Sequence, residues 1–318
     1  MAKADYILSI IKSHYNNEPE RFTTHALQIA AHEAKLGHSS LANEIKTIID
    51  NAKEAKLKTK TFTSPELQGL IVENVPAVNL ADMIASADIK EKIGRIISEF
   101  VQRDKLRKYD LENRRKILLS GPPGTGKTLT ASIIAHELNL PLYTILMDKM
   151  VTKFMGETSA KLRQIFDLIE QKKGIYLFDE FDAIGGERSR DNDVGEMRRV
   201  LNSFLQFIER DNSDSLIIAI TNNKALLDQA LFRRFDDVIL YHLPDRKEKL
   251  ALLKNRLSRF STKVNFTQLL PNINGLSHAE ISLACLDAIK ETVLNEKQQM
   301  NNQIILKAIK DRNAAYHK

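Results

Sequence analysis

The strongest chemical signal in the chain is the glycine-rich stretch Gly121–Thr128. Its sequence, GPPGTGKT, fits G-x-x-x-x-G-K-[ST], the pattern of a loop that binds phosphate. Glycines let successive backbone N–H groups turn toward an anion, and a helix that begins there adds its positive end. Lys127 would reach the β- and γ-phosphates, and the Thr128 hydroxyl would hold Mg²⁺. The alternative is an ordinary glycine- and proline-rich turn, although a chance match in such a chain occurs only on the order of once in a hundred.

The residues on either side of this loop have the composition that a phosphate-binding loop needs. Residues 116–120 form a short apolar run that is typical of a buried strand, and residues 129–138 are helix-forming without a breaker. Strand, loop and helix in this order support more than a pattern match. The residues predicted to contact a nucleotide here are Gly121, Pro122, Pro123, Gly124, Thr125, Gly126, Lys127, Thr128 and Leu129.

A second constellation follows another apolar run, residues 175–178, which ends in Asp179 and Glu180. A strand that is apolar on both faces belongs inside a parallel sheet, and its end lies at the same edge as the phosphate loop. We expect Asp179 to support Mg²⁺ and Glu180 to orient and polarise an attacking water. The alternative is that both carboxylates merely cap a following helix.

The elements that must position these residues alternate in type over residues 79–243. Short apolar runs at 117–119, 142–146, 175–178, 216–220 and 238–240 are separated by helical patterns. Such alternation predicts right-handed crossovers and an α/β fold with a parallel sheet, whose ligands bind at the carboxyl ends of the strands. Residues 244–318 are helical only, and they predict a small C-terminal helical domain.

The N-terminal part has a different organisation. Residues 1–57 are typical of three amphipathic helices in a small bundle, to which we assign recognition of a substrate or partner. Residues 58–78 are rich in Thr, Ser, Pro and Gly and predict a linker. Apolar residues within the linker indicate that part of it packs on the next domain. They are Leu67, Leu70, Ile71, Val72 and Val75.

Composition limits the class of protein. The 318 residues suffice for about two domains, and 28% charged with 43% hydrophobic residues is typical of a soluble globular protein. No run approaches the roughly 18 apolar residues that span a bilayer. Cys285 is the only cysteine, which excludes an internal disulfide, and its apolar helical setting predicts a buried thiol. We expect a cytoplasmic protein that does not engage a membrane.

The chain is basic, with a formal net charge of +6 and an isoelectric point near 9.1. Much of the excess lies between Lys90 and Lys116. A basic cluster can bind nucleic acid, but no helix-turn-helix, zinc finger or aromatic RNA-binding signature accompanies it. A solvated helix face beside a domain for an anionic ligand explains the charge at least as well.

These motifs together resemble those of AAA+ ATPases, in the clade of katanin, spastin, proteasomal ATPases and their bacterial relatives. The resemblance runs from about Asn79 to the C-terminus, and Asp179–Gly185 is similar to that clade's extended Walker B segment. The family resemblance implies that Asn222, after the strand at 215–220, is the sensor 1 residue that reports the γ-phosphate to the water site. Taken alone, Asn222 would be a plain turn residue.

Residues 230–236 resemble the arginine-finger segment, in the short form with two adjacent arginines. The resemblance implies that Arg233 and Arg234 reach the nucleotide of a neighbouring subunit and stabilise charge on the transferred phosphoryl group. Such residues need a head-to-tail interface that closes into a ring, and a hexamer is usual in this family. The alternative is two surface cations near a helix end.

Residues 153–157 resemble the family's first pore loop, which precedes a helix. The resemblance implies that Phe154, Met155 and Gly156 line a central channel and grip an extended polypeptide. Local packing of Phe154 in the core is the alternative.

The segments around the base depart from the family pattern. Asp82, Met83 and Ile84 align with the adenine-contacting segment, but Ala85 stands where glycine is usual. Residues 275–280 resemble G-x-S-G-A-[DE], with His278 in place of a glycine near the nucleotide. The resemblance implies ATP binding and leaves the details of base recognition open.

The sequence therefore predicts a P-loop NTPase fold, with a parallel sheet and a C-terminal helical lid, that hydrolyses ATP with Mg²⁺. We expect a homo-oligomeric ring that remodels, unfolds or disassembles protein substrates through a central pore. The alternative is an ATP-dependent switch or chaperone that regulates a bound partner, such as a separately encoded protease. A nucleic-acid loader is less favoured, because no DNA-reading module is apparent.

Overall fold

The computed structural model describes residues 13, 19–35, 38, 41–45, 47, 67, 69–74, 76, 78–150, 155–182, 191–222, 232–260, 264–295 and 300–316. The chain divides into two compact units, Met1–Gln68 and Gly69–Lys318.

Helix α2 (Pro19–Lys35) is the main described element of the first unit, and residues 41–45 are also helical. The helix has an apolar stripe in which Ala26 and Ala30 are buried. Glu33, with only 2% of its surface exposed, contacts the His38 imidazole at 2.7 Å. The second predicted helix is thus observed, and the first lies almost entirely outside the described residues.

The second unit is built on a sheet of six strands in the order β1-β3-β4-β5-β2-β6. Every neighbouring pair is parallel except β1 and β3. This confirms the predicted α/β class, and each predicted apolar run is a strand. The strands are β1 (Ile71–Asn74), β2 (Lys116–Ser120), β3 (Leu142–Leu146), β4 (Ile175–Asp179), β5 (Leu216–Thr221) and β6 (Asp237–Leu240).

Strand β1 lies within the segment that the sequence assigned to a linker. It pairs antiparallel with β3, for example Ile71 with Ile145, at the edge of the sheet. Three of its four residues are exposed, so the strand lacks the continuous apolar character of its parallel neighbours. Part of the linker therefore packs on the next domain, as its apolar residues indicated.

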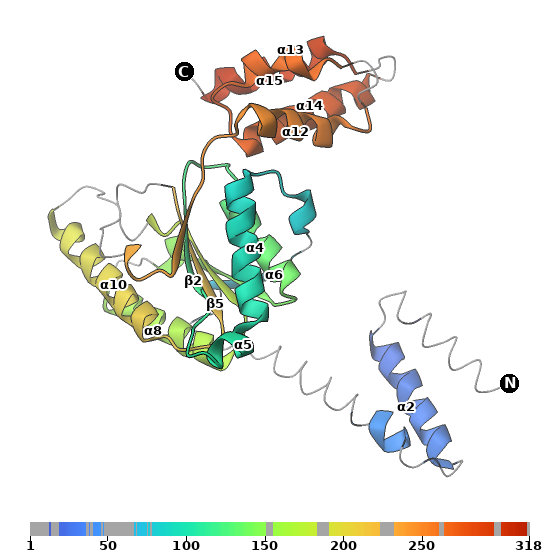
Figure 1. Ribbon diagram of the computed structural model, residues 1–318, viewed down its shortest axis with the longest axis vertical. Coiled ribbons are helices and arrows are strands. Elements are labelled where there is room, and N and C mark those ends of the chain that lie inside the picture. The colour runs from blue at the N-terminus through green and yellow to red at the C-terminus, as the bar shows by residue number, and fades with distance from the viewer. Residues whose placement is uncertain are drawn as a thin grey trace. The chain divides into compact units, whose positions relative to one another are not determined.

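Helices cover both faces of the sheet (Figure 1). On one face, α4 (Ala87–Val101) and α6 (Lys127–Glu137) share an apolar core with the strands that includes Ile93, Ile134 and Ile218. On the other face lie α8 (Met155–Gln171) and α10 (Asp191–Arg210). The shorter helices of this part are η2 (Leu80–Asp82), α5 (Arg103–Arg107) and α7 (Met147–Met150).

Aromatic rings join α8 and α10 to strand β4. Phe178 of β4 lies 5.1 Å from the ring of Phe204, and Phe181, just beyond the strand, lies 4.6 Å from the same ring. All three side chains are fully buried. This packing holds the end of β4, whose last residue is Asp179 and which Glu180 follows, against a rigid support.

The lid comprises α12 (Arg246–Leu257), α13 (Phe266–Leu269), η4 (Leu270–Ile273), α14 (His278–Leu294) and α15 (Asn302–Tyr316). Its helices bury a separate apolar core that includes Leu253, Ile281 and Cys285. Burial raises the pKa of the Cys285 thiol to about 12, so the thiol is protonated at neutral pH, as its sequence context predicted.

Within the described residues, none of the helices has the length and apolar character needed to cross a membrane.

Candidate nucleotide-binding site

The phosphate-binding loop joins β2 to α6, as its sequence required. Gly124 has φ +72°, and a Cβ at this position would lie 2.5 Å from the Ser277 hydroxyl at the start of the lid helix α14. Only glycine combines this backbone conformation with so close an approach. The Gly124 carbonyl accepts a 2.9 Å hydrogen bond from the Ala279 backbone N–H. The lid therefore contacts the phosphate-binding loop directly.

The Lys127 side chain folds back over the loop. It is 5% exposed, and its ammonium donates hydrogen bonds to the carbonyls of Gly121 at 2.8 Å and Pro122 at 2.7 Å. Burial lowers the pKa of Lys127, while the carboxylates of Asp179 and Asp182 act in the opposite direction. An ammonium held in this way can exchange carbonyl acceptors for phosphate oxygens without leaving the loop.

Two oxygen ligands suited to Mg²⁺ meet at the start of α6 and the end of β4. The Thr128 hydroxyl donates a 3.2 Å hydrogen bond to Asp179 Oδ2. Within the described residues, no group of three or more His, Cys, Asp and Glu side chains could hold a metal. A hydroxyl and one carboxylate fit Mg²⁺, which keeps several waters and takes its other ligands from substrate phosphates.

Glu180 has a left-handed backbone, with φ +54°, which is uncommon for a residue other than glycine. Its N–H donates to Asp179 Oδ1 at 2.9 Å, and the next N–H, of Phe181, donates to the Ile220 carbonyl at 2.8 Å. These bonds and the buried Phe181 ring maintain the conformation. Strained backbone of this kind occurs at functional sites, and here it leaves the Glu180 carboxylate exposed at the pocket.

Asn222 follows strand β5, which lies between β4 and β2 in the sheet. Its backbone N–H donates to Asp182 Oδ1 at 3.4 Å, and its side chain is exposed at the pocket. Three adjacent parallel strands thus end at one edge, with the phosphate loop, the two carboxylates and the amide together.

These residues surround a pocket of about 470 Å³, which we call the nucleotide pocket. Its volume is within the usual range for small-molecule sites. Most predicted nucleotide-contacting residues line it, while Gly121 and Pro122 instead supply the carbonyls that accept from Lys127. The predicted residues in the lining are Asp82, Met83, Ile84, Pro123–Leu129, Asp179, Glu180, Asn222 and His278.

Six further residues line the nucleotide pocket without having been predicted. Five of them lie on the lid helices α12 and α14, and of these Ala279 alone falls within the segment at 275–280 that resembles a family motif near the nucleotide. Their approach to the pocket depends on how the lid folds back on the sheet, which residue spacing does not reveal. They are Ile220, Leu252, Asn255, Arg256, Ala279 and Ser282.

The two arginines of the arginine segment (residues 230–236) lie outside the lining of the nucleotide pocket of their own chain. Arg234 Nε lies 3.2 Å from Glu209 Oε2 at the end of α10. Arg233 is exposed, and its side chain makes no hydrogen bond or ion pair with any described residue. The two neighbours therefore differ, because within the described part of the chain Arg234 has a carboxylate partner and Arg233 does not.

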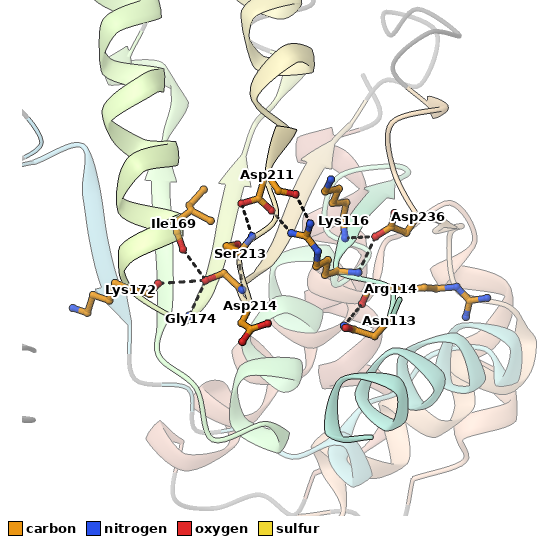
Figure 2. Close-up of polar contacts among 12 residues, drawn as sticks. Asn113, Arg114, Lys116, Ile169, Lys172, Gly174, Asp211, Ser213, Asp214 and Asp236 are labelled. Atoms are coloured by element: carbon orange, nitrogen blue, oxygen red, sulfur yellow. Dashed lines mark hydrogen bonds and ion pairs between the residues drawn. The ribbon is translucent and has the colours of Figure 1, made fainter. Parts of the chain in front are cut away.

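Asp236, at the end of this segment, attaches it to the start of β2 (Figure 2). Its Oδ2 accepts 2.9 Å hydrogen bonds from the backbone N–H groups of Arg115 and Lys116, and its own N–H donates to the Lys116 carbonyl at 2.8 Å. The Arg115 guanidinium in turn forms a buried ion pair with Asp211, just after α10. Sequence analysis missed Asp236, whose role depends on the pairing of β6 with β2.

Of the predicted pore-loop residues, Phe154 lies outside the described residues. Met155 and Gly156 form the first two positions of α8, so the helix begins inside the segment at 153–157 that was predicted to be a loop. The structure describes the backbone of these two residues and not their side chains.

Comparison with known proteins agrees with this fold. Residues 117–243 match the AAA family, described as the ATPase family associated with various cellular activities. Over 317 residues the chain is 30% identical to the uncharacterized AAA family ATPase y4kL of Sinorhizobium fredii, covering 98% of this chain and 96% of that protein. The chain therefore belongs to the AAA family of ATPases, and it is an ATP-binding hydrolase.

More distant relatives share only part of their length with it. The chain is 34% identical over 208 residues to a proteasome-activating nucleotidase of Methanoregula boonei, covering 63% of this chain and 48% of that one. It is 33% identical over 230 residues to the ATP-dependent zinc metalloprotease FtsH of Mycoplasma mobile, and the match covers 69% of this chain and 31% of that protein.

Proposed function

We propose that this ATPase assembles into a homo-oligomeric ring, a hexamer by family expectation, and uses ATP hydrolysis to remodel or unfold protein substrates. The observation that carries the ring is Arg233, an exposed cation that has no partner among the described residues and lies outside its own nucleotide pocket. An arginine that stabilises phosphoryl transfer from a neighbouring subunit needs this placement. The proteasome-activating and metalloprotease relatives support a protein substrate.

The described geometry supports a division of roles in hydrolysis. Thr128 and Asp179 would hold Mg²⁺, which neutralises charge on the phosphates when bound. Glu180 would accept a proton from a water molecule as the water oxygen attacks the γ-phosphorus. The bond from the γ-phosphorus to the β–γ bridging oxygen breaks at the same time, which yields ADP and phosphate. Lys127 and Asn222 would orient the γ-phosphate, and Arg233 of the neighbouring subunit would stabilise its developing charge.

The remaining assignments follow the family resemblance. Phe154, Met155 and Gly156 would face the central channel and grip the polypeptide. Residues 1–57 would select the substrate, residues 58–78 would link them to the ATPase domain at 79–243, and the lid at 244–318 would complete the nucleotide pocket. We place the activity in the cytoplasm, away from membranes and nucleic acid. A second candidate, a switch that activates a separately encoded protease, is favoured by the proteasome-activating relatives.

ATP turnover in the presence of different polymers tests the proposed substrate class. We expect an unfolded protein to stimulate hydrolysis several-fold, and we expect single-stranded DNA of matched net charge to have no effect. Stimulation by DNA alone would overturn the protein-remodelling proposal. Proteins that stay bound to a Glu180→Gln ring in the presence of ATP would identify the substrate. If the ring captures a protease and no substrate protein, the switch is favoured.

A further inference from the structure

His278 is the first residue of α14, beside the Ala279 N–H that hydrogen-bonds to the phosphate-binding loop. Its side chain lines the nucleotide pocket and also a smaller adjoining cavity of about 190 Å³, which we call the hinge cavity. The hinge cavity lies between the start of α4, the connection from β6 to α12, and Thr125 of the phosphate-binding loop. His278 therefore stands where the two spaces meet.

The His278 imidazole has no hydrogen-bond partner within the described residues, although both of its ring nitrogens are buried. A buried polar group without a partner costs free energy, and in a binding site it indicates contact with a ligand or water. Burial also lowers the pKa of His278, with Glu248 and Asp245 acting in the opposite direction. The ring is therefore neutral at pH 7, with one N–H donor and one acceptor nitrogen.

The carboxylates nearest to the imidazole are already engaged. Asp245 and Glu248 form the capping box of α12, in which each carboxylate accepts a 2.7 Å hydrogen bond from the backbone N–H of the other residue. These bonds fix both side chains at the helix start. Neither carboxylate makes a hydrogen bond to His278, so they act on it only through their charge.

The other polar side chains of the hinge cavity also have partners within the protein, except the exposed His242, which has none in the part of the chain that the structure describes. Ser86 accepts from the Ile89 N–H at 3.3 Å, Thr125 donates to the Pro122 carbonyl at 2.8 Å, and the Tyr241 hydroxyl pairs with that of Thr130 at 2.6 Å. Among the described buried groups of this cavity, the imidazole is thus the one whose hydrogen-bonding capacity is unused.

We propose that the His278 imidazole hydrogen-bonds the edge of the adenine base when ATP occupies the nucleotide pocket. Adenine presents an amino donor beside ring-nitrogen acceptors, which complements a neutral imidazole. A glycine at this position could offer only its backbone. The contact rests on the proposed nucleotide site. It adds to that site the His278 side chain as a group that recognises the base.

The test is a thermodynamic cycle that removes the imidazole and the base separately. Equilibrium affinities for ATP and for base-free ribose 5′-triphosphate are measured by calorimetry for the wild type and for His278→Ala. We expect His278→Ala to weaken ATP binding about tenfold, the effect of one hydrogen bond, and to leave ribose triphosphate binding unchanged. His278→Asn, which keeps a donor and an acceptor, should recover part of the loss.

Controls separate base recognition from folding and from the wider proposal. Because the imidazole has no partner among the described residues, His278→Ala should melt without nucleotide at the wild-type temperature or above it. His242→Ala, in the same cavity, should bind both ligands as the wild type does. Equal losses for both ligands, or no loss for either, would overturn the base contact. If the wild type binds ATP and Lys127→Ala abolishes that binding, the proposed nucleotide site holds even when the base contact fails.

Discussion

The Lys127 ammonium is held between two opposing influences. Burial lowers its pKa, whereas the carboxylates of Asp179 and Asp182 raise it. The carbonyls of Gly121 and Pro122 stabilise the charged form by accepting its hydrogen bonds. A phosphate brought into the pocket adds negative charge, which favours the same charged form and makes this lysine the main point charge available to the ligand.

Lys127→Ala should therefore abolish measurable nucleotide binding. The folded protein loses the hydrogen bonds to two loop carbonyls and the attraction of two nearby carboxylates, but it no longer has to bury a charge, so the melting temperature without nucleotide should change little. Calorimetry with ATP and thermal melting of the same preparation check both expectations. Micromolar ATP binding by a folded Lys127→Ala protein would contradict the assignment of the phosphate site.

Glu180→Gln should bind ATP with near wild-type affinity and hydrolyse it at least about a hundred times more slowly, because an amide cannot accept the proton from water. Single-turnover hydrolysis, measured beside equilibrium binding, separates the two effects. Glu180→Asp is the matched control, because it keeps the charge and should retain partial activity. Parental turnover in Glu180→Gln would exclude this carboxylate as the catalytic base.

At the scale of elements, β2 connects two functional segments. The phosphate-binding loop begins at its carboxyl end, and Asp236 holds the arginine segment at its first residues (Figure 2). The buried pair of Arg115 with Asp211 joins α10 to the same point. A displacement of the arginine segment by a neighbouring subunit would therefore act on a strand that leads directly to the bound phosphates.

The two adjacent arginines should differ when mutated. Arg233→Ala should reduce hydrolysis by about a thousandfold or more, because an arginine finger contributes on the order of 10³ to 10⁵ in rate. Arg234→Ala loses a half-exposed pair with Glu209 and should have the smaller direct effect. Turnover per assembled ring measures both, and Arg210→Ala, an exposed arginine at the nearby end of α10, is the charge control.

Mixing experiments determine whether Arg233 acts across subunits. Arg233→Ala and Lys127→Ala subunits, each inactive alone, should recover part of the hydrolysis when combined, because intact Lys127 can then face intact Arg233. Mixed rings that contain both variants in proven co-assembly yet stay inactive at every ratio would argue against a finger supplied in trans.

The sequence predicts those elements whose burial is continuous. Strands β2 to β5 are largely buried apolar runs within the sheet, and the phosphate-binding loop needs glycines at fixed spacing. Strand β6 is an edge strand with one buried residue, and its short apolar run at 238–240 still marked it. Strand β1 was missed as a strand because Ile71–Asn74 is an edge strand with three exposed residues. The lid residues of the pocket, such as Asn255 and Arg256, could not be found, because their approach depends on contacts between distant segments.

At the scale of the whole molecule, the compact unit Gly69–Lys318 includes β1 and does not require the first unit for its sheet. Deleting residues 1–57 should leave basal hydrolysis and assembly largely intact while partner recognition is lost. Turnover, sedimentation and substrate pull-down measure these effects. A truncated protein that folds but no longer assembles would make the N-terminal part an oligomerisation element.

A longer deletion provides the matched control for that truncation. Removing residues 1–75 also removes β1 and exposes the edge of β3, whose backbone groups would then lack partners. We expect this protein to melt at a lower temperature and to aggregate. Equal stability of the two truncations would mean that β1 contributes little to the sheet.

Phe154 distinguishes a threading motor from a switch. It directly precedes α8, whose first residue is Met155, and family resemblance assigns it to the central channel, away from the nucleotide pocket. An aromatic ring in a channel can press on any passing chain without sequence preference. Phe154→Ala should therefore keep ATP binding, assembly and most basal hydrolysis, and it should abolish unfolding of a substrate.

A core position for Phe154 predicts a different outcome, a loss of about 3–5 kcal/mol in the free energy of unfolding, with hydrolysis falling in parallel. Phe154→Tyr is the control, because it keeps the aromatic ring and should retain unfolding activity in a channel. Thermal melting, ATP turnover and substrate unfolding on the two variants separate these cases. If Phe154→Ala is stable, hydrolyses ATP and still unfolds a genuine substrate at the full rate, threading by this loop is excluded, and the ring acts as a switch.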